Sequence, residues 1–438
     1  MSSYDRFTAG SGLTRVELKG SLATFNWNMG LRSVFDILCA PSGFVYVGFA
    51  LALGVAREKM GYITAVVSVA CIVQMMALVL ANYVRDRKRF VMALGVIEPM
   101  VLIAAVLAVP LVPAPARFAC LALAAFMGSA AFHLSRPTSE EWLASAIPGG
   151  IRSRYLGRRF QIQSVVVIAA TLGAGWIAER IGNQNTGATA LLLAAGGLFG
   201  VLAVLPLRSA AMPAASLATH FRWADMAMCF RNRAFRAYLL AIVAVHVPFW
   251  FACPYYQVFY LNDLAMPQSR ISYMMSAYYI VKTSVLPMFG RLIGRHAPGR
   301  VMAGIVPIYV LFFLAMTASA AHRTWPVFAG WALVGVADAG WIVMINSALY
   351  ASVPPGAGRQ AYFAVNNLVM FAGWTIGAAL AVPLLEAIQH VSISVGPFRL
   401  GQMHVLFLMS ALWLCPIAMV ARLLRMAGND LRNGPGSS

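Results

Sequence analysis

Long apolar stretches alternate with short polar segments along the whole chain. A helix needs roughly 20 mostly apolar residues to cross the hydrocarbon core of a bilayer, and stretches of that length recur twelve times. They are residues 33–55, 61–83, 91–111, 118–137, 161–181, 188–207, 237–259, 271–290, 301–320, 326–350, 361–385 and 403–424. Pro and Gly interrupt several of them, which membrane helices tolerate. The pattern predicts an all-α integral membrane protein with twelve transmembrane helices.

Composition supports this reading. Of the 438 residues, 61% are hydrophobic and 11% are charged, and the mean hydropathy is +0.75. A soluble protein carries about 25% charged residues. The six cysteines are scattered singly without CxxC spacing, so we interpret them as small apolar residues and expect no metal and no cofactor. Motifs such as HExxH, GxSxG or a nucleotide-binding loop are also missing from the sequence, and we therefore expect no enzyme.

Positive charges are distributed unevenly about the predicted spans. If the N-terminus is cytoplasmic and the spans alternate, 25 of the 33 Lys and Arg residues fall on the cytoplasmic side, seven on the other, and only Lys282 within a span. Cytoplasmic loops carry such an excess. We predict a multi-pass protein of the cytoplasmic (inner) membrane with both termini in the cytoplasm. The net charge of +19 is then explained by topology and by attraction to membrane lipid, and we expect no nucleic-acid partner.

The longest connection on the predicted cytoplasmic side separates the first six spans from the last six. Its second half places apolar and basic residues at helical spacing, which predicts an amphipathic helix on the membrane surface. The predicted organisation is an N-terminal segment, a six-helix bundle, a central loop, a second six-helix bundle and a tail, at residues 1–32, 33–207, 208–236, 237–424 and 425–438. Transporters built from two such repeats bind substrate at the repeat interface.

Each predicted half has a basic loop after its second span. The first, VRDRKRF (84–90), contains Arg87, Lys88 and Arg89. The second runs from Gly290 through Arg295 to Arg300 and resembles the G-x-L-x-D-R-x-G-R motif of the major facilitator superfamily. Residues 142–159 are similar to the fourth-to-fifth loop of a poorly characterised bacterial subgroup of that superfamily.

The resemblance implies a transporter of two six-helix bundles, in which these basic loops act as conformational switches. It also implies that helices 1, 4, 7 and 10 line a central cavity. Two departures stand out: Gly294 replaces the usual acid of the second motif, and the first copy lacks its leading Gly. The fifth span lacks the Gly-Pro pattern of family antiporters, which favours symport.

Ionisable residues inside spans are the strongest candidates for chemistry. A charge at the centre of a membrane helix costs roughly 2.5–3.5 kcal/mol on insertion scales. His246, Lys282 and Asp338 lie about ten to twelve residues into spans seven, eight and ten, and hence at similar depth. Since the resemblance places helix 8 close to helix 10, we expect Lys282 and Asp338 to pair. The pair either borders the substrate and carries a proton or contacts an anion, or it only fixes helix packing.

Aromatic and amide side chains extend this predicted site. We add Trp250, Tyr279, Trp341 and Asn366 as residues that face the cavity. Small-molecule sites usually combine aromatic walls with a few fixed polar groups. Tyr and Trp are also common at membrane interfaces, and this reading stays open.

A second polar set occurs in the predicted N-terminal half. Asp36 is predicted in the first turn of helix 1, and His133 and Arg136 share one face near the end of helix 4. We predict an Asp36–Arg136 pair that acts as a cytoplasmic gate, with snorkelling of side chains at the interface as the alternative. Glu98 in span three is expected to be a hydrogen-bonded structural acid.

The sequence thus predicts a secondary active transporter, a permease that moves a small polar or anionic solute by alternating access. Proton coupling through Asp338 and Lys282 is an additional hypothesis. The alternative is a non-transporting membrane receptor or assembly partner with a transporter fold. We expect a monomer whose partners are the small-molecule substrate, membrane lipid and, with coupling, protons.

Overall fold

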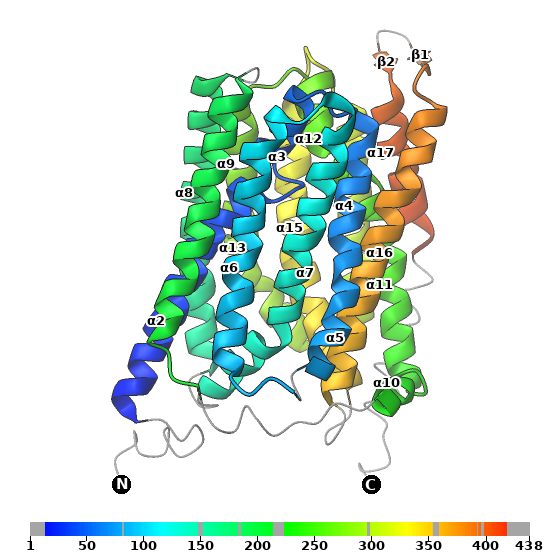
Figure 1. Cartoon of the computed structure of the whole chain (residues 1–438). Coiled ribbons are helices and arrows are strands. Elements are labelled where there is room, and N and C mark those ends of the chain that lie inside the picture. The colour runs from blue at the N-terminus through cyan, green and yellow to red at the C-terminus, as the bar shows by residue number, and fades with distance from the viewer. Residues whose placement is uncertain are drawn as a thin grey trace, which may run out of the picture. The chain divides into compact units, whose positions relative to one another are not determined.

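The computed structural model is built almost entirely of helices (Figure 1). It describes residues 14–80, 83–147, 152–182, 185–212, 223–295, 298–353, 359–391, 393–395 and 398–417. The predicted tail, residues 425–438, lies outside the described residues. Contacts between residues divide the chain into two compact units, Met1–Val55 with Ala70–Phe221 and Ala56–Val69 with Arg222–Ser438.

The first unit, called unit 1 below, contains the helices of the first predicted bundle apart from the start of the second span. Its elements, in which η marks short helical turns, are α2 (Arg15–Cys39), α3 (Phe44–Ala52), η2 (Ala70–Ile72), α5 (Val73–Leu80), α6 (Arg87–Ala108), η3 (Val109–Leu111), α7 (Ala114–Ala146), α8 (Arg152–Ile181), α9 (Thr186–Val204) and η5 (Leu205–Arg208). Helix α6 packs against α7 and α9, and α2 packs against α8 and α9.

The second unit, unit 2, contains the second predicted bundle together with residues 56–69. Its elements are η1 (Arg57–Lys59), α4 (Met60–Val69), α10 (Trp223–Cys229), α11 (Arg233–Ala252), η7 (Cys253–Tyr255), α12 (Tyr256–Val258), η8 (Phe259–Asp263), α13 (Gln268–Arg295), α14 (Pro298–Thr317), α15 (Trp325–Ser352), α16 (Arg359–Ala387), β1 (Ile393–Val395), β2 (Phe398–Leu400), α17 (Gln402–Leu414) and η9 (Cys415–Ile417). Helix α15 packs against α13 and α14, while α16 packs against α11 and α4. The strands β1 and β2 pair as a short antiparallel hairpin.

Within the described residues, every predicted span overlaps one or more helices; residues 81–82 and 418–424 of the predicted spans lie outside the described residues. Among the described residues, ten helical segments are long and apolar enough to cross a membrane. The other two predicted spans are α13, which carries Lys282 at its centre, and α17, whose described part is only 13 residues long. The fold class predicted from the apolar pattern is therefore confirmed, while the domain boundaries stay a prediction.

Helix 1 does not begin where its apolar pattern predicted. Helix α2 begins at Arg15, well before residue 33, because Thr14 and Glu17 form a capping box and no proline interrupts the chain before Pro41. Asp36 therefore lies in the last turn of α2 and not in a first turn, so its predicted place is wrong. Residues 213–222 of the central loop lie outside the described residues. In the second half of this loop, where an amphipathic helix was predicted, the structure has the short helix α10 (Trp223–Cys229), and α11 begins at Arg233. A place of α10 on the membrane surface stays a prediction.

Small residues of α9 bring three helices of unit 1 close together. A Cβ atom on Gly196 would lie 2.7 Å from Leu38 Cβ, and one on Gly200 would lie 2.8 Å from atoms of Phe35 and Pro99. Small residues permit this close approach of helix backbones. The packing fixes α2 and α6 against α9 and so positions the polar side chains that α2 and α6 carry.

Candidate functional site

A polar cluster lies inside unit 2 where α13, α14 and α15 pack together. Lys282 Nζ lies 3.6 Å from Asp338 Oδ2 and donates a hydrogen bond of 2.9 Å to the hydroxyl of Tyr278. That hydroxyl in turn donates to Asp338 Oδ2. The hydroxyl of Tyr309 donates to Asp338 Oδ1 at 2.7 Å. The predicted pairing of Lys282 with Asp338 is confirmed, and two phenols that were not predicted as members complete the cluster.

Helix spacing and one glycine explain how these groups meet. Tyr278 and Lys282 are four residues apart on α13 and therefore share a face. Gly335 lies one turn before Asp338 on α15, and a Cβ atom there would lie 2.9 Å from the backbone oxygen of Tyr278. Only glycine permits this approach, which brings the carboxylate of α15 within reach of α13.

The two charged groups are more accessible than the phenols that hold them. The side chains of Lys282 and Asp338 are 26% and 23% exposed, whereas Tyr278 and Tyr309 are 6% and 2% exposed. Hydrogen bonds to an ionised carboxylate are among the strong ones in proteins. The phenols therefore fix Asp338 firmly, while Lys282 and one side of the carboxylate remain open to a ligand or a proton.

Aromatic rings gather on α11, α15 and α16 near this cluster. The ring of His246 lies 5.5 Å from that of Trp341 and 5.9 Å from that of Trp374. Trp250 stacks on Trp374 with ring centroids 4.4 Å apart. Trp341 is three residues after Asp338 on α15, so both lie on the same side of that helix. The structure thus connects three predicted residues in one row of ring contacts, from Trp341 through His246 to Trp374 and Trp250.

The other two predicted residues of this site differ in their placement. Tyr279 is half-buried, and its ring lies 4.9 Å from that of Tyr278, so it borders the polar cluster. Asn366 is buried and accepts a hydrogen bond of 2.8 Å from Tyr238. Asn366 precedes Trp374 by eight residues on α16, which corresponds to about 12 Å along the helix. Its hydrogen bond therefore connects α11 and α16 at a point away from the aromatic rings.

The predicted gate pair of unit 1 is not formed. Asp36 accepts a bond of 2.8 Å from Arg32 on its own helix, and Arg136 donates one of 2.7 Å to Glu140 on its own helix. Both pairs have the four-residue spacing that places side chains on one helix face, and these nearer partners prevail over a partner on another helix. His133 is buried beside Phe132, with ring centroids 5.3 Å apart.

A buried ion pair that the sequence reading did not identify lies in the same unit. Arg32 binds both carboxylate oxygens of Glu98, at 2.5 and 2.7 Å. Its guanidinium also lies over the rings of Phe35 and Phe132, 4.7 and 4.8 Å from their centroids. Glu98 is thus the hydrogen-bonded acid that was expected. Arg32 had been counted with the cytoplasmic loops, although its spacing of four from Asp36 was a visible signal.

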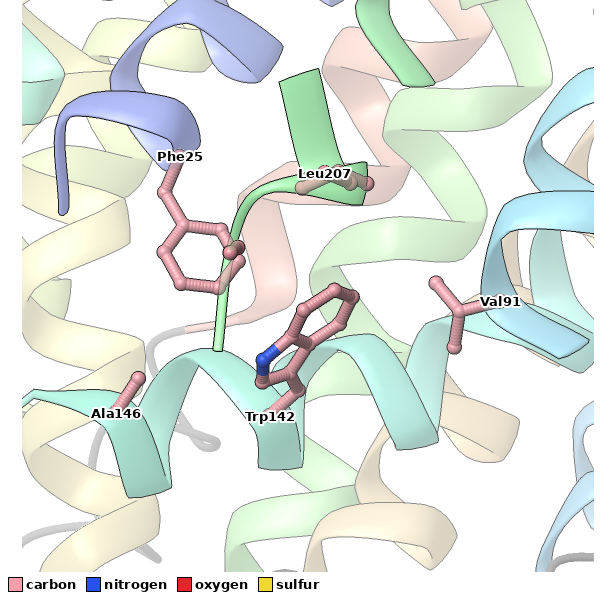
Figure 2. Packing of buried hydrophobic residues seen from close by; sticks show 6 residues of the cluster. Phe25, Val91, Trp142, Ala146 and Leu207 are labelled. Atoms are coloured by element: carbon pink, nitrogen blue, oxygen red, sulfur yellow. The ribbon is translucent and has the colours of Figure 1, made fainter. Parts of the chain in front are cut away.

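Lys88, a residue of the first basic segment, binds the backbone that follows α9. Lys88 Nζ donates to the backbone oxygens of Arg208 and Ala210 at 2.7 and 2.8 Å. Beside it, Trp142 donates to the backbone oxygen of Ala211 at 2.8 Å. Figure 2 shows Trp142 packed with Ala146 of its own helix and with Phe25, Val91 and Leu207 of other elements. Lys88 therefore contacts backbone that follows a different helix.

The remaining residues of the predicted switch loops have varied surroundings. Arg87 is buried, while Arg89 is exposed and lies 2.9 Å from Asp86. Gly290 is exposed inside α13, and that helix continues to Arg295 instead of ending at residue 290 as predicted. The reason is that residues 291–295 contain no proline, and a single glycine, Gly294, does not end a helix. Arg300 is exposed in the first part of α14, and the switch role of all these residues stays a prediction.

Comparison with known proteins supports the fold. No family model matches the sequence, and no curated protein matches it. Crystal structures are similar over nearly the whole chain. A mutant of the nucleoside transporter NupG has a TM-score of 0.69 at 13% identity, covering 91% of this chain and 99% of that chain, and another NupG structure has 0.67 at 12%, covering 93% and 99%.

A bacterial homologue of the human lysosomal transporter Spinster, in an inward-facing and occupied conformation, has a TM-score of 0.68 at 13% identity, covering 96% of this chain and 98% of that chain. At such low identity the likeness concerns the fold alone. These neighbours are transporters and not enzymes. The chain is a multi-pass membrane protein with the major facilitator fold.

Proposed function

We propose that this chain is a secondary transporter that moves a small polar or anionic solute across the cytoplasmic membrane by alternating access. The observation that carries the proposal is the partly accessible Lys282–Asp338 pair inside an apolar bundle. Ionisable residues within membrane helices are expensive and mark substrate or proton pathways. The fold shared with known transporters supports the same reading.

The surroundings of the pair favour a solute that combines a flat ring with a polar or anionic group. Lys282 supplies a positive charge, and the rings of Trp250, Trp341 and Trp374 supply flat apolar faces. Sites for small molecules commonly use this combination. Because one structural neighbour is a nucleoside transporter, nucleosides belong in the first panel of solutes, together with aromatic and aliphatic carboxylates.

In this proposal, the carboxylate of Asp338 couples solute binding to proton uptake. When Asp338 takes up a proton, it loses its charge, and Lys282 loses its ionic partner 3.6 Å away. The ammonium group then becomes available to an anionic or polar group of the solute. Proton binding and solute binding would favour one another in this arrangement, as symport requires.

Uptake into proteoliposomes with an imposed pH gradient tests the proposal. We expect accumulation of one panel member that depends on the gradient, and loss of the gradient dependence in Asp338→Asn. Lys282→Met should lower uptake at least tenfold, whereas Arg270→Ala, an exposed change at the start of the same helix, should leave it unchanged. A panel member that binds the protein but is never accumulated would contradict transport and support the receptor alternative.

A further inference from the structure

A groove between α2 and α8 of unit 1 is lined by Asn26, and Arg159 lies one turn before the groove residue Ile162; each carries a shielded polar atom without a partner among the described residues. Its volume is about 410 Å³, and its walls are mostly apolar, with Gly30, Leu31 and Val34 on α2 and Ile162 and Val166 on α8. This size lies within the range of small-molecule sites. The groove belongs to one unit and shares no residue with the polar cluster of unit 2.

Two contacts fix how the helices border the groove. The hydroxyl of Tyr155 on α8 donates to the backbone oxygen of Leu22 on α2 at 2.9 Å. Farther along both helices, a Cβ atom on Gly30 would lie 3.8 Å from a methyl group of Val166. The two helices therefore run in the same direction along the groove.

Arg159 and Asn26 lie between those contacts. Arg159 follows Tyr155 by four residues and precedes Ile162 and Val166 by three and seven, so it shares their helix face. Asn26 lines the groove and follows Leu22 by four residues on α2. The helix face that carries Arg159 is thus the one turned toward α2 and the groove.

Neither polar group has a protein partner at its shielded atom. Within the described part of the chain, Arg159 Nε and Asn26 Oδ1 are shielded from solvent and make no hydrogen bond. The described salt bridges also include none to Arg159, although its side chain is half-buried. A guanidinium remains charged at all physiological pH values, and a charge withdrawn from water without a counter-ion is costly. A half-buried guanidinium whose Nε lacks a protein partner is well suited to bind an anion from outside the chain.

We propose that this groove binds an anionic phospholipid, with its phosphate on Arg159 and one acyl chain along the apolar walls. A small soluble anion would satisfy Arg159 and leave the walls bare, and an uncharged lipid would fill the groove and leave Arg159 unpaired. A head-group hydroxyl or ammonium would donate to Asn26 Oδ1. Trp27, which lines the groove and is 68% exposed, is of a residue type enriched where lipid meets water.

A second basic side chain adjoins Arg159 in the sequence. Arg158, its neighbour, is exposed at the start of a membrane-crossing segment. Lys and Arg at such positions attract the anionic lipids of the cytoplasmic leaflet by about 1 kcal/mol each. The bound lipid would bridge α2 and α8 beside the hydrogen bond between Tyr155 and Leu22, and it would thereby stabilise unit 1.

Thermal unfolding of the delipidated full-length protein in an uncharged detergent tests this. Phosphatidylglycerol should raise the melting temperature, and phosphatidylcholine with the same acyl chains should not. Arg159→Gln should weaken the apparent affinity for phosphatidylglycerol at least tenfold, while the matched control Arg180→Gln, an exposed change at the other end of α8, should retain it. An equal effect of both lipids, or full retention by Arg159→Gln, would overturn the proposal.

A second readout locates the acyl chain independently of Arg159. Phosphatidylglycerol with brominated acyl chains should quench the fluorescence of Trp27, measured as the difference between the parent and Trp27→Phe. Gly30→Leu should abolish that quenching, since a larger side chain would occupy the groove. Quenching that persists in Gly30→Leu, or a melting shift reproduced by inorganic phosphate alone, would show that no lipid chain occupies the groove.

Discussion

The coupling between Lys282 and Asp338 can be measured directly. Exposed ion pairs contribute about 0–1 kcal/mol, and breaking a buried pair costs about 3–5 kcal/mol. Here the two side chains are 26% and 23% exposed, and after Lys282→Met the carboxylate would keep its bonds from Tyr278 and Tyr309. We therefore expect an intermediate coupling, about 2 kcal/mol.

The assay is a double-mutant cycle on the free energy of unfolding, with Lys282→Met, Asp338→Asn and the double variant. Each single change leaves one group of the pair without its ionic partner, so the double variant should be more stable than the sum of the single effects predicts. Arg291→Ala combined with Asp338→Asn is the control. Arg291 lies nine residues, or about 13 Å, along α13 from Lys282, so these two changes should be additive.

A coupling within about 0.5 kcal/mol of zero, the usual error of additivity, would refute the argument. It would mean that the hydroxyl of Tyr278, and not the ammonium of Lys282, stabilises the charge of Asp338. The control also guards against a general effect of removing positive charge from α13, because such an effect would appear with Arg291→Ala as well.

Two further predictions concern packing and the ion pair of unit 1. Gly335→Ala should destabilise the protein by about 1–3 kcal/mol, measured by thermal unfolding, as overpacking does. The reason is that the new Cβ atom would lie 2.9 Å from the backbone oxygen of Tyr278. Gly290→Ala is the control and should not destabilise the protein, because a Cβ atom there meets nothing within 4 Å. Arg32→Met should cost about 3 kcal/mol by leaving Glu98 buried without its partner, and adding Glu98→Gln should restore most of that loss. Equal stability of both glycine variants, or no rescue by Glu98→Gln, would contradict these assignments.

Physical reasons explain why some side-chain contacts could be predicted from the sequence and others could not. The pairing of Lys282 with Asp338 was predictable because lone charges in membrane helices need partners and the fold resemblance placed their helices together. The contact of Tyr309 with Asp338 was not predictable. Tyr309 belongs to another span, and in an almost uniformly apolar span the sequence does not show which side chains face the neighbouring helix. The pair of Asp36 with Arg136 was wrong because partners four residues away on the same helices were overlooked.

The geometry of the two ion pairs indicates which of them can take part in exchange. Arg32 and Glu98 make two parallel bonds of 2.5 and 2.7 Å, and the guanidinium is enclosed by two aromatic rings. A solute that displaced this pair would have to replace both bonds and both ring contacts at once. Such a bidentate pair is specific and strong, and it suits a structural role.

The pair of Lys282 and Asp338 is built differently. Its ions are 3.6 Å apart, one hydroxyl joins them, and about a quarter of each side chain is exposed. A ligand that takes Lys282 leaves Asp338 with its two phenol bonds, and a proton that neutralises Asp338 releases Lys282 without disturbing the packing of α13. Since each group can change partner while the other stays satisfied, exchange at this pair costs less than exchange at Arg32 and Glu98, and the coupling chemistry of the proposed transporter belongs in unit 2.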